Sequence, residues 1–212
     1  MRIGILGSGL IGGKLGTLFA RAGHQVTFSY SRSIDKLEGL AAEAGNGARV
    51  GSPAQAAKTA DIVLLAVHWS RVDEVLALAG DLAGKTVITC SLPMTKDDTA
   101  LAVGHMSSGA EKLAAKIPEA HVVSAFSTTP SEVLFGVFEA KGTRPAPTLV
   151  YCGDDRHAKE IAAQLIADLG FEPMDAGALQ LARYIEPFSL LVASIAYDRN
   201  ARPEVSYRIE RR

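Results

Sequence analysis

The stretch Gly7-Ser8-Gly9-Leu10-Ile11-Gly12 decides the fold of this chain. It follows an apolar run at residues 3–6 and opens a segment, residues 10–22, whose apolar side chains recur with helical spacing. In a G-x-G-x-x-G turn the first glycine permits the tight bend, the second lets the backbone approach a pyrophosphate, and the third allows close helix–strand packing. The free amides and dipole of the helix N-terminus then attract phosphates. The motif therefore predicts a dinucleotide-binding turn formed by Gly7, Ser8, Gly9, Leu10, Ile11 and Gly12.

Strand and helix patterns alternate along the rest of the chain. Further strands are expected at residues 25–30, 50, 61–67, 86–90, 121–125, 148–152 and 171–174, and further helices at residues 34–44, 54–59, 70–79, 110–116, 154–169 and 178–197. The last helix is apolar nearly all round, which predicts a buried helix. The alternation predicts an α/β Rossmann fold, a doubly wound parallel sheet with a small, mainly helical C-terminal part. We expect a nucleotide-binding Rossmann domain over residues 1–150 and a small extension packed on it over residues 151–212.

Composition excludes several classes of protein. The 212 residues carry a net charge of −1 and are 48% hydrophobic and 21% charged, which disfavours a basic nucleic-acid-binding surface and wholesale disorder. No apolar run reaches the ~20 residues of a membrane helix. Cys90 and Cys152 are too few for a disulfide scaffold, and the five histidines are scattered without metal-ligand spacing. We therefore expect a cytoplasmic protein with no metal site and no nucleic-acid or membrane partner.

The segment after the second strand indicates which dinucleotide is bound. An NAD site places an acidic residue about 20 residues after the glycines, where it bonds the ribose 2′-hydroxyl. Here that position holds Ser31 and Arg32, with Lys36 one helical turn further on and no acid before Asp35. A hydroxyl, a guanidinium and an ammonium suit a dianionic 2′-phosphate. The sequence therefore favours NADPH over NADH.

The chemistry of the second substrate is indicated by what is missing. The chain has no Tyr-x-x-x-Lys pair and no cluster with zinc-ligand spacing, and only about 60 residues follow Cys152, too few for a large helical substrate domain. A flavin-like ring that accepts a hydride needs alignment more than acid–base help. The absence of a catalytic constellation therefore favours hydride exchange with such a ring, and we assign no catalytic side chain.

The ordered set of motifs resembles the coenzyme F420-dependent NADP oxidoreductases, whose Rossmann domain is also related to that of the STEAP ferric reductases. The matching pieces are Gly7–Gly12, Ser31-Arg32 with Lys36, Leu65-Ala66-Val67-His68-Trp69, Ser91-Leu92-Pro93, Val122 to Pro130, Cys152-Gly153-Asp154-Asp155 and Met174-Asp175-Ala176-Gly177. The resemblance implies NADP(H) in the crevice at the strand ends, a deazaflavin stacked on its nicotinamide, and a dimer.

The resemblance also assigns site residues. It implies 2′-phosphate contacts at Ser31, Arg32 and Lys36, a nicotinamide-side loop at Val67, His68 and Trp69, and an acceptor pocket at Thr128, Thr129, Pro130 and Ser131. Two positions depart from the family pattern: His68 stands where a proline is expected, and archaeal members carry His-Thr-Ile-Pro or similar where this chain has Ser127-Thr128-Thr129-Pro130. Coenzyme F420, FMN and FAD therefore all stay open as the acceptor.

The function predicted from the sequence is NADPH-dependent hydride transfer to a deazaflavin or flavin. Two alternatives stay open: an NADPH-dependent reductase of a small imine or carbonyl compound, with His68 as proton donor, and an NADP(H)-sensing module without turnover. The apolar last helix predicts a homodimer formed through it. We also expect a surface pair of Arg183 with Glu186, a helix N-cap at Asp154-Asp155, and a solvated or subunit-contacting tail after Asp198.

Overall fold

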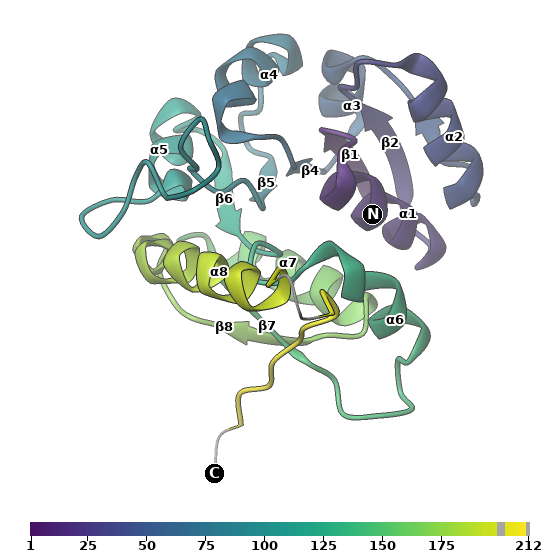
Figure 1. The fold of residues 1–212 in the computed structure, drawn as a ribbon. Helices are drawn as coiled ribbons and strands as arrows, with labels where there is room; N and C mark the ends of the chain where they lie inside the picture. The colour runs from purple at the N-terminus through teal and green to yellow at the C-terminus, as the bar shows by residue number, and fades with distance from the viewer. Residues whose placement is uncertain (199–201, 211–212) are drawn as a thin grey trace.

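The predicted strands form one sheet in the computed structural model, which describes residues 1–198 and 202–210. Their order across the sheet is β3-β2-β1-β4-β5-β6-β7-β8 (Figure 1). The bounds are β1 (Arg2–Leu6), β2 (Gln25–Ser29), β3 (Arg49–Val50), β4 (Ile62–Leu65), β5 (Thr86–Thr89), β6 (His121–Ser124), β7 (Thr148–Gly153) and β8 (Glu172–Asp175).

Strand pairing is parallel from β3 through β6. The only antiparallel pair among the described strands joins β6 to β7, with Ser124 opposite Cys152, and β8 then runs parallel to β7. Because β1 pairs with both β2 and β4, the strand order reverses direction at β1. Ligands of open α/β sheets bind in the crevice outside the carboxyl ends of the strands at such a reversal.

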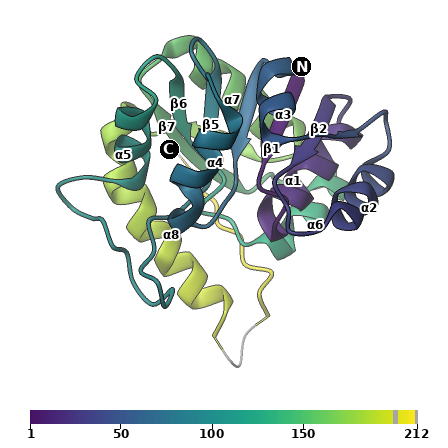
Figure 2. The same cartoon turned by 90° about the horizontal axis from the view of Figure 1, so that it is seen from above.

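Helices cover both faces of the sheet, as the view from above shows (Figure 2). One core cluster contains side chains of α1, α2, α6 and α7, and the other contains side chains of α3, α4, α5 and α8. The bounds are α1 (Leu10–Arg21), α2 (Ile34–Ala44), α3 (Pro53–Thr59), α4 (Val72–Ala79), α5 (Gly109–Lys116), α6 (Leu134–Glu139), α7 (Arg156–Asp168) and α8 (Ala182–Ala196). This arrangement confirms the doubly wound α/β fold predicted from the sequence.

Two helix starts follow directly from local sequence. Ser52 accepts a hydrogen bond from the Gln55 amide while the Gln55 side chain accepts one from the Ser52 amide, a capping box that starts α3. Asp155 accepts a hydrogen bond from the Ala158 amide and caps α7, so the expected aspartate cap is present but the expected acid in the first turn is not. Helix α6 was not predicted, because its six residues contain a central glycine, Gly136, and no side chain caps its start.

Two expectations about α8 are wrong. The helix is not buried all round, since Tyr184, Leu191 and Ile195 are more than half exposed. Arg183 and Glu186 do not form a surface pair either. The Glu186 side chain is 2% exposed and accepts hydrogen bonds from the amides of Gly109 (2.9 Å) and Ala110 (3.0 Å) at the start of α5, while Arg183 forms a bidentate ion pair with Glu111. Burial raises the pKa of Glu186 to about 7, and the two amides act in the opposite direction.

The C-terminal third adds β7 and β8 to the sheet, and the tail after α8 then contacts the start of β7. The boundary expected at residue 150 lies inside β7, and the division into two domains stays a prediction. After α8, residues 202–210 return to β7, where the Thr148 amide donates to the Tyr207 carbonyl. Part of the tail expected after Asp198, including Arg199, Arg211 and Arg212, lies outside the described residues. Across the described residues, no helix is long and apolar enough to cross a membrane.

Candidate dinucleotide and acceptor site

A cavity of about 530 Å³ opens at the carboxyl ends of β1, β2 and β4. Three loops form it, one after each strand, so it lies where the strand order reverses. Its lining residues are Gly7, Ser8, Gly9, Tyr30, Ser31, Arg32, Ser33, Lys36, Ala66, Val67, His68, Arg71 and Glu74.

The three glycines of the turn, Gly7, Gly9 and Gly12, differ in what a side chain at each position would meet. Gly7 has φ +112°, and a Cβ there would overlap the Ala66 carbonyl, so the fold itself requires glycine. A Cβ at Gly12 would overlap the Gly7 carbonyl oxygen, which is the close helix–strand approach expected of the third glycine. A Cβ at Gly9 would meet no protein atom within 4 Å. Because neither strain nor packing demands glycine at position 9, the open space beside it fits a ligand that approaches the backbone.

The start of α1 offers unpartnered backbone donors to this space. Gly9 is the N-cap of α1, and no side chain caps the helix. The amides of a first helical turn have no partner within the helix, and no acidic residue lies in the first turn of α1. Ser8 is turned inward, since its hydroxyl donates to the Ser29 carbonyl at 2.9 Å. The first turn of α1 can therefore hold phosphate oxygens through its backbone, with Ser8 supporting the turn.

The cationic residues after β2 are available to a ligand. Ser31 accepts a hydrogen bond from the Ser33 amide, and Ser33 caps α2 by accepting from the Lys36 amide, so the loop is ordered by its own hydroxyls. Arg32 and Lys36 are exposed and form no ion pair within the described part of the chain. Both line the cavity, which gives this end of it a positive charge.

Five lining residues were not predicted as site residues: Tyr30, Ser33, Ala66, Arg71 and Glu74. Tyr30 adopts φ 57° and donates its hydroxyl to Glu74 at 2.9 Å, and Arg71 forms an ion pair with the same carboxylate at 2.7 Å. The hydrogen bond from Arg71, followed by that from Tyr30, lowers the pKa of Glu74. Because Arg71 is neutralised by Glu74, Arg32 and Lys36 are the unpaired cations of this cavity among the described residues. The network of Tyr30, Arg71 and Glu74 joins the end of β2 to α4, and the spacing of these residues in the sequence does not predict it.

His68 is held on both of its ring nitrogens. Nδ1 accepts from the Ser70 amide at 3.2 Å, so Nε2 carries the proton and donates to Asp98 at 2.8 Å. Asp98 belongs to the loop after β5 and adopts φ 55°. The backbone of neighbouring Val67 is fixed by Ser91, whose hydroxyl donates to the Val67 carbonyl at 2.7 Å. The structure therefore shows His68 and Val67 joining the nucleotide cavity to the loop of residues 91–104.

The remaining predicted residues of this loop and turn lie outside the cavity. The Leu10 side chain is 73% exposed, Gly12 packs against Gly7, and Trp69 is half-buried against the core cluster beneath α4. Ile11 points to a second cavity instead.

That second cavity, of about 180 Å³, lies along the same edge of the sheet at the ends of β5 and β6. Its floor combines Ile11, Cys90 and Leu92 with residues 126–131, and α8 closes it with Ser189, Val192, Ala193 and Tyr197. Thr128, Thr129 and Pro130, the predicted acceptor-side residues, all line it. The strand order 2-1-4-5-6 thus places the two cavities along adjoining strand ends, with Ile11 of α1 reaching from the first to the second.

Among the described residues that line it, the acceptor-side cavity has hydroxyls but no carboxyl, imidazole or ammonium group. Ser127, Thr128, Thr129, Ser131 and Ser189 supply its polar groups, and burial raises the pKa of the Cys90 thiol to about 12. Burial and the hydrogen bond to Glu132 likewise raise the pKa of Tyr197 to about 12. Within the described residues, no group of three or more His, Cys, Asp or Glu side chains is arranged to hold a metal ion.

Comparison with known proteins agrees with this geometry. Residues 2–93 match the family model "NADP oxidoreductase coenzyme F420-dependent". The chain is 30% identical over 189 residues to metalloreductase STEAP3 of Rattus norvegicus, an alignment that covers 89% of this chain but spans only 36% of that relative.

Solved structures share the fold. A candidate F420-dependent NADP-reductase from Arthrobacter sp. FB24 superposes with a TM-score of 0.86 at 22% identity over 100% of both chains. A reductive aminase from Aspergillus terreus in complex with NADPH and ethyl-5-oxohexanoate superposes with a TM-score of 0.68 at 18% identity, over 92% of this chain and 61% of that one. Over residues 2–93 the chain is therefore similar to NADP-dependent oxidoreductases, and over 189 residues it is similar to a metalloreductase. The resemblance drawn from the sequence is thus confirmed, with residues 2–93 matching the coenzyme F420-dependent NADP oxidoreductase family.

Proposed function

We propose that this chain binds NADP(H) in the 530 Å³ cavity and transfers hydride between it and a deazaflavin, coenzyme F420, or a flavin such as FMN or FAD. The observation that carries the proposal is the open backbone at Gly9 beside two unpaired cations, Arg32 and Lys36, in one cavity at the strand-order reversal. The diphosphate would lie on the first turn of α1, and Ser31, Arg32 and Lys36 would hold the 2′-phosphate through charge-assisted hydrogen bonds.

The adjoining cavity is assigned to the acceptor. NADPH supplies the hydride when bound, and the chain supplies alignment and exclusion of water. Val67 and His68 border the nicotinamide end, and Thr128, Thr129 and Pro130 border the acceptor ring. At about 180 Å³ the cavity is smaller than a pocket that encloses a whole drug-sized ligand, so only the flat reactive part of the acceptor would enter it.

The absence of a proton donor among the described residues that line the acceptor cavity favours a flavin-like acceptor. A flavin or deazaflavin ring accepts hydride and takes its accompanying proton from water, whereas an imine or carbonyl compound needs a proton at the reacting centre. His68, the donor considered for such a compound, donates to Asp98 and lines the nucleotide cavity. The similarity to reductive aminases is one of fold and not of sequence, at 18% identity, so it ranks imine reduction below reduction of a flavin-like ring. Imine reduction is the second candidate. A sensor without turnover is the third.

The direct test offers purified protein and NADPH to coenzyme F420, FMN and FAD in parallel, with NADH as the control donor. Turnover with any of the three supports hydride transfer to that acceptor, and turnover with the deazaflavin alone identifies the acceptor of the matched family. Reduction of a small cyclic imine, with none of the three ring acceptors reduced, would replace the proposal by imine reduction. NADPH binding without any turnover would favour the sensor.

We also propose that two copies associate through α8. The side chains of Tyr184, Leu191 and Ile195 are between 53% and 68% exposed on this helix, a large apolar exposure for a monomer surface. A charge placed in such a contact, as in Leu191→Glu, should convert a dimer into a monomer. Light scattering after gel filtration distinguishes the two, and a wild-type protein of monomeric mass contradicts the proposal. A cytoplasmic location also stays a prediction.

A further inference from the structure

The acceptor-side loop, residues 126–131, is held from outside by three contacts. Phe126 is 1% exposed and adopts φ 67°, a conformation that a bulky side chain occupies only when its surroundings impose it. Lys14 of α1 donates to the Ser131 carbonyl (3.1 Å) and hydroxyl (3.0 Å), and Ser189 of α8 bonds Ser127 at 3.0 Å. The third contact comes from the C-terminal tail, where the Tyr207 hydroxyl donates to Thr128 Oγ1 at 2.7 Å.

The tail is itself fixed to the sheet on both sides of Tyr207. The Thr148 amide, at the start of β7, donates to the Tyr207 carbonyl at 2.9 Å, and the Ile209 amide donates to the Thr148 hydroxyl at 2.9 Å. The Tyr207 ring packs edge-on against Phe188 of α8 with 5.0 Å between ring centroids. The tail therefore has a defined place, and the hydroxyl of Tyr207 is directed at Thr128 by contacts that do not involve the loop.

Thr128 depends on this contact for its orientation. Its side chain is fully buried, at 0% exposure, and lines the acceptor cavity. A buried hydroxyl needs a hydrogen-bond partner, and no hydrogen bond of its side chain other than that from Tyr207 appears among the described residues. Burial raises the pKa of Tyr207, so its hydroxyl keeps its proton and remains a donor at neutral pH.

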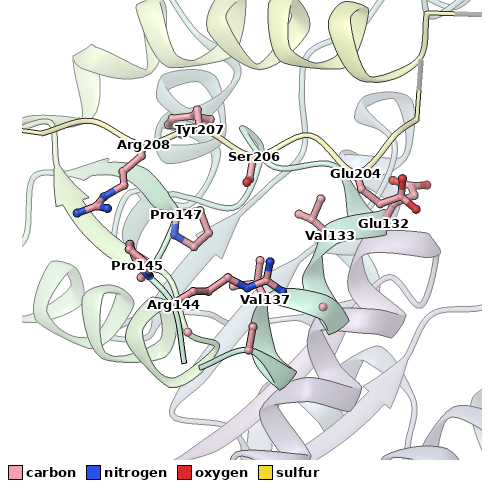
Figure 3. A pocket seen from close by; sticks show the side chains of 14 residues that line it. Glu132, Val133, Val137, Arg144, Pro145, Pro147, Glu204, Ser206, Tyr207 and Arg208 are labelled. Atoms are coloured by element: carbon pink, nitrogen blue, oxygen red, sulfur yellow. The ribbon is translucent and has the colours of Figure 1, made fainter. Parts of the chain in front are cut away.

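The acceptor-side loop is itself buried, since Phe126, Thr128, Thr129 and Ser131 are between 0% and 6% exposed. The 3-10 helix Ser131–Val133 that follows it borders a separate cavity of about 350 Å³, closed by α6, by the loop at Arg144, Pro145 and Pro147, and by the tail itself (Figure 3). Figure 3 shows the tail crossing above Pro147 with Tyr207 and Arg208 on it. Tyr207 both lines this cavity and donates to Thr128, so the tail links the wall of the cavity to the acceptor-side loop.

We propose that residues 204–209 form a strap whose Tyr207 positions Thr128, and with it the acceptor-side loop, for binding of the redox acceptor. This inference rests on the proposed function for its catalytic consequence. Tyr207 is a positioning residue that acts through Thr128, so the nucleotide cavity is outside its reach.

Tyr207→Phe tests the strap by removing one hydroxyl while keeping the ring contact with Phe188. We expect the KM for the acceptor found among coenzyme F420, FMN and FAD to rise about fivefold, the effect of one hydrogen bond, with the Kd for NADPH changed less than twofold. Ser206→Ala removes the neighbouring tail hydroxyl, which makes no hydrogen bond in the described structure, and should match wild type. Thr128→Val should raise the acceptor KM as Tyr207→Phe does, whereas Thr128→Ser, which keeps a hydroxyl, should have the acceptor KM of wild type. The double variant Thr128→Val with Tyr207→Phe should raise the acceptor KM no more than either single substitution.

Hydrogen exchange of the ligand-free protein tests the strap without turnover. In Tyr207→Phe the amides of residues 126–131 should exchange several-fold faster, with residues 7–12 unchanged as the internal reference. Where wild type reduces an acceptor, an unchanged acceptor KM in Tyr207→Phe overturns the strap and leaves the proposed function intact. Where wild type reduces none of the acceptors, the proposed function fails, and exchange alone decides the strap: unchanged exchange at 126–131 overturns it, and faster exchange confined to that loop supports it.

Discussion

The two cavities along the sheet edge are built in opposite ways. The nucleotide cavity takes all its lining residues from the first 74 residues, in three loops that each follow a strand directly. The acceptor cavity combines the start of α1, the ends of β5 and β6, and α8, and its loop is held by contacts that cross 62 to 117 residues of sequence. The first combines the glycine turn with side chains from three neighbouring loops, and the second depends on single side chains from distant elements.

This difference determines what each cavity tolerates. The glycine turn is fixed by backbone geometry and helix position, so substitutions at its glycines either break the fold or block the ligand. A cradle of side-chain hydrogen bonds can change one contact at a time, so substitutions there can alter the acceptor cavity and leave the nucleotide cavity unchanged. Of the two departures from the family pattern, Ser127 lines the acceptor cavity, whereas His68 lines the nucleotide cavity and donates to Asp98 in the loop after β5.

The largest contrast is expected within the glycine turn itself. Gly12→Val would drive a side chain into the Gly7 carbonyl and should cost about 4 kcal/mol of folding free energy or more. Gly9→Val faces open space, so it should leave the melting temperature within a few degrees of wild type while weakening NADPH binding at least tenfold. Thermal melts and NADPH titrations of both variants separate the two roles. Normal NADPH affinity in Gly9→Val would place the dinucleotide elsewhere.

The acceptor side should depend on the buried carboxylate that ties α8 to α5. Glu186→Ala leaves the Gly109 and Ala110 amides buried without partners and should cost about 3 kcal/mol in urea unfolding. Glu160→Ala, which removes an exposed pair with Arg156, is the matched control and should cost less than about 0.5 kcal/mol. Equal losses in the two variants would contradict the structural role of Glu186.

Removing Arg32, one of the two unpaired cations of the nucleotide cavity, should reduce the preference for NADPH over NADH without lowering the stability of the fold. Arg32→Ala should weaken NADPH binding by about 2 kcal/mol, roughly thirtyfold, because a charge-assisted hydrogen bond to the 2′-phosphate is lost. NADH binding should barely change. Arg71→Ala is the comparison variant, since that guanidinium is already paired with Glu74 and should alter NADPH affinity less. Equal loss for both cofactors in Arg32→Ala would refute the 2′-phosphate assignment.

The smallest effect is a pH dependence confined to the acceptor side. The pKa of Glu186 in the folded chain is about 7, above its ordinary value of 4.5, so the folded state holds the proton more tightly than the unfolded state. Stability should therefore fall by between about 1 and 2 kcal/mol as pH rises from 5.5 to 7. Glu186→Gln cannot ionise and should flatten this slope. A slope that persists in Glu186→Gln would assign it to another group.

The same contrast explains how much could be predicted from the sequence. The glycine turn, the set Ser31, Arg32 and Lys36, and the order of the predicted strands and helices depend on local chemistry, and all appear in the structure near the predicted positions. Three features depend on which distant segments pack together, and the periodicity of the sequence does not predict such contacts. They are helix α6, the partners of Glu186 and the Tyr30–Glu74–Arg71 network. Glu186 misled the prediction because a carboxylate three residues after Arg183 fits a surface pair equally well. The tail was interpreted from its charged residues alone, as a solvated or subunit-contacting segment. The residues that bond it to Thr148 are the uncharged Tyr207 and Ile209.

The most direct test of the account is a calorimetric titration of the wild-type protein with NADPH and with NADH at the same pH and ionic strength. Every nucleotide contact inferred from the structure, other than those of Ser31, Arg32 and Lys36, is common to both cofactors. The account predicts saturable binding of NADPH that is at least tenfold tighter than that of NADH. Equal affinity for the two cofactors, or binding of neither, would contradict it.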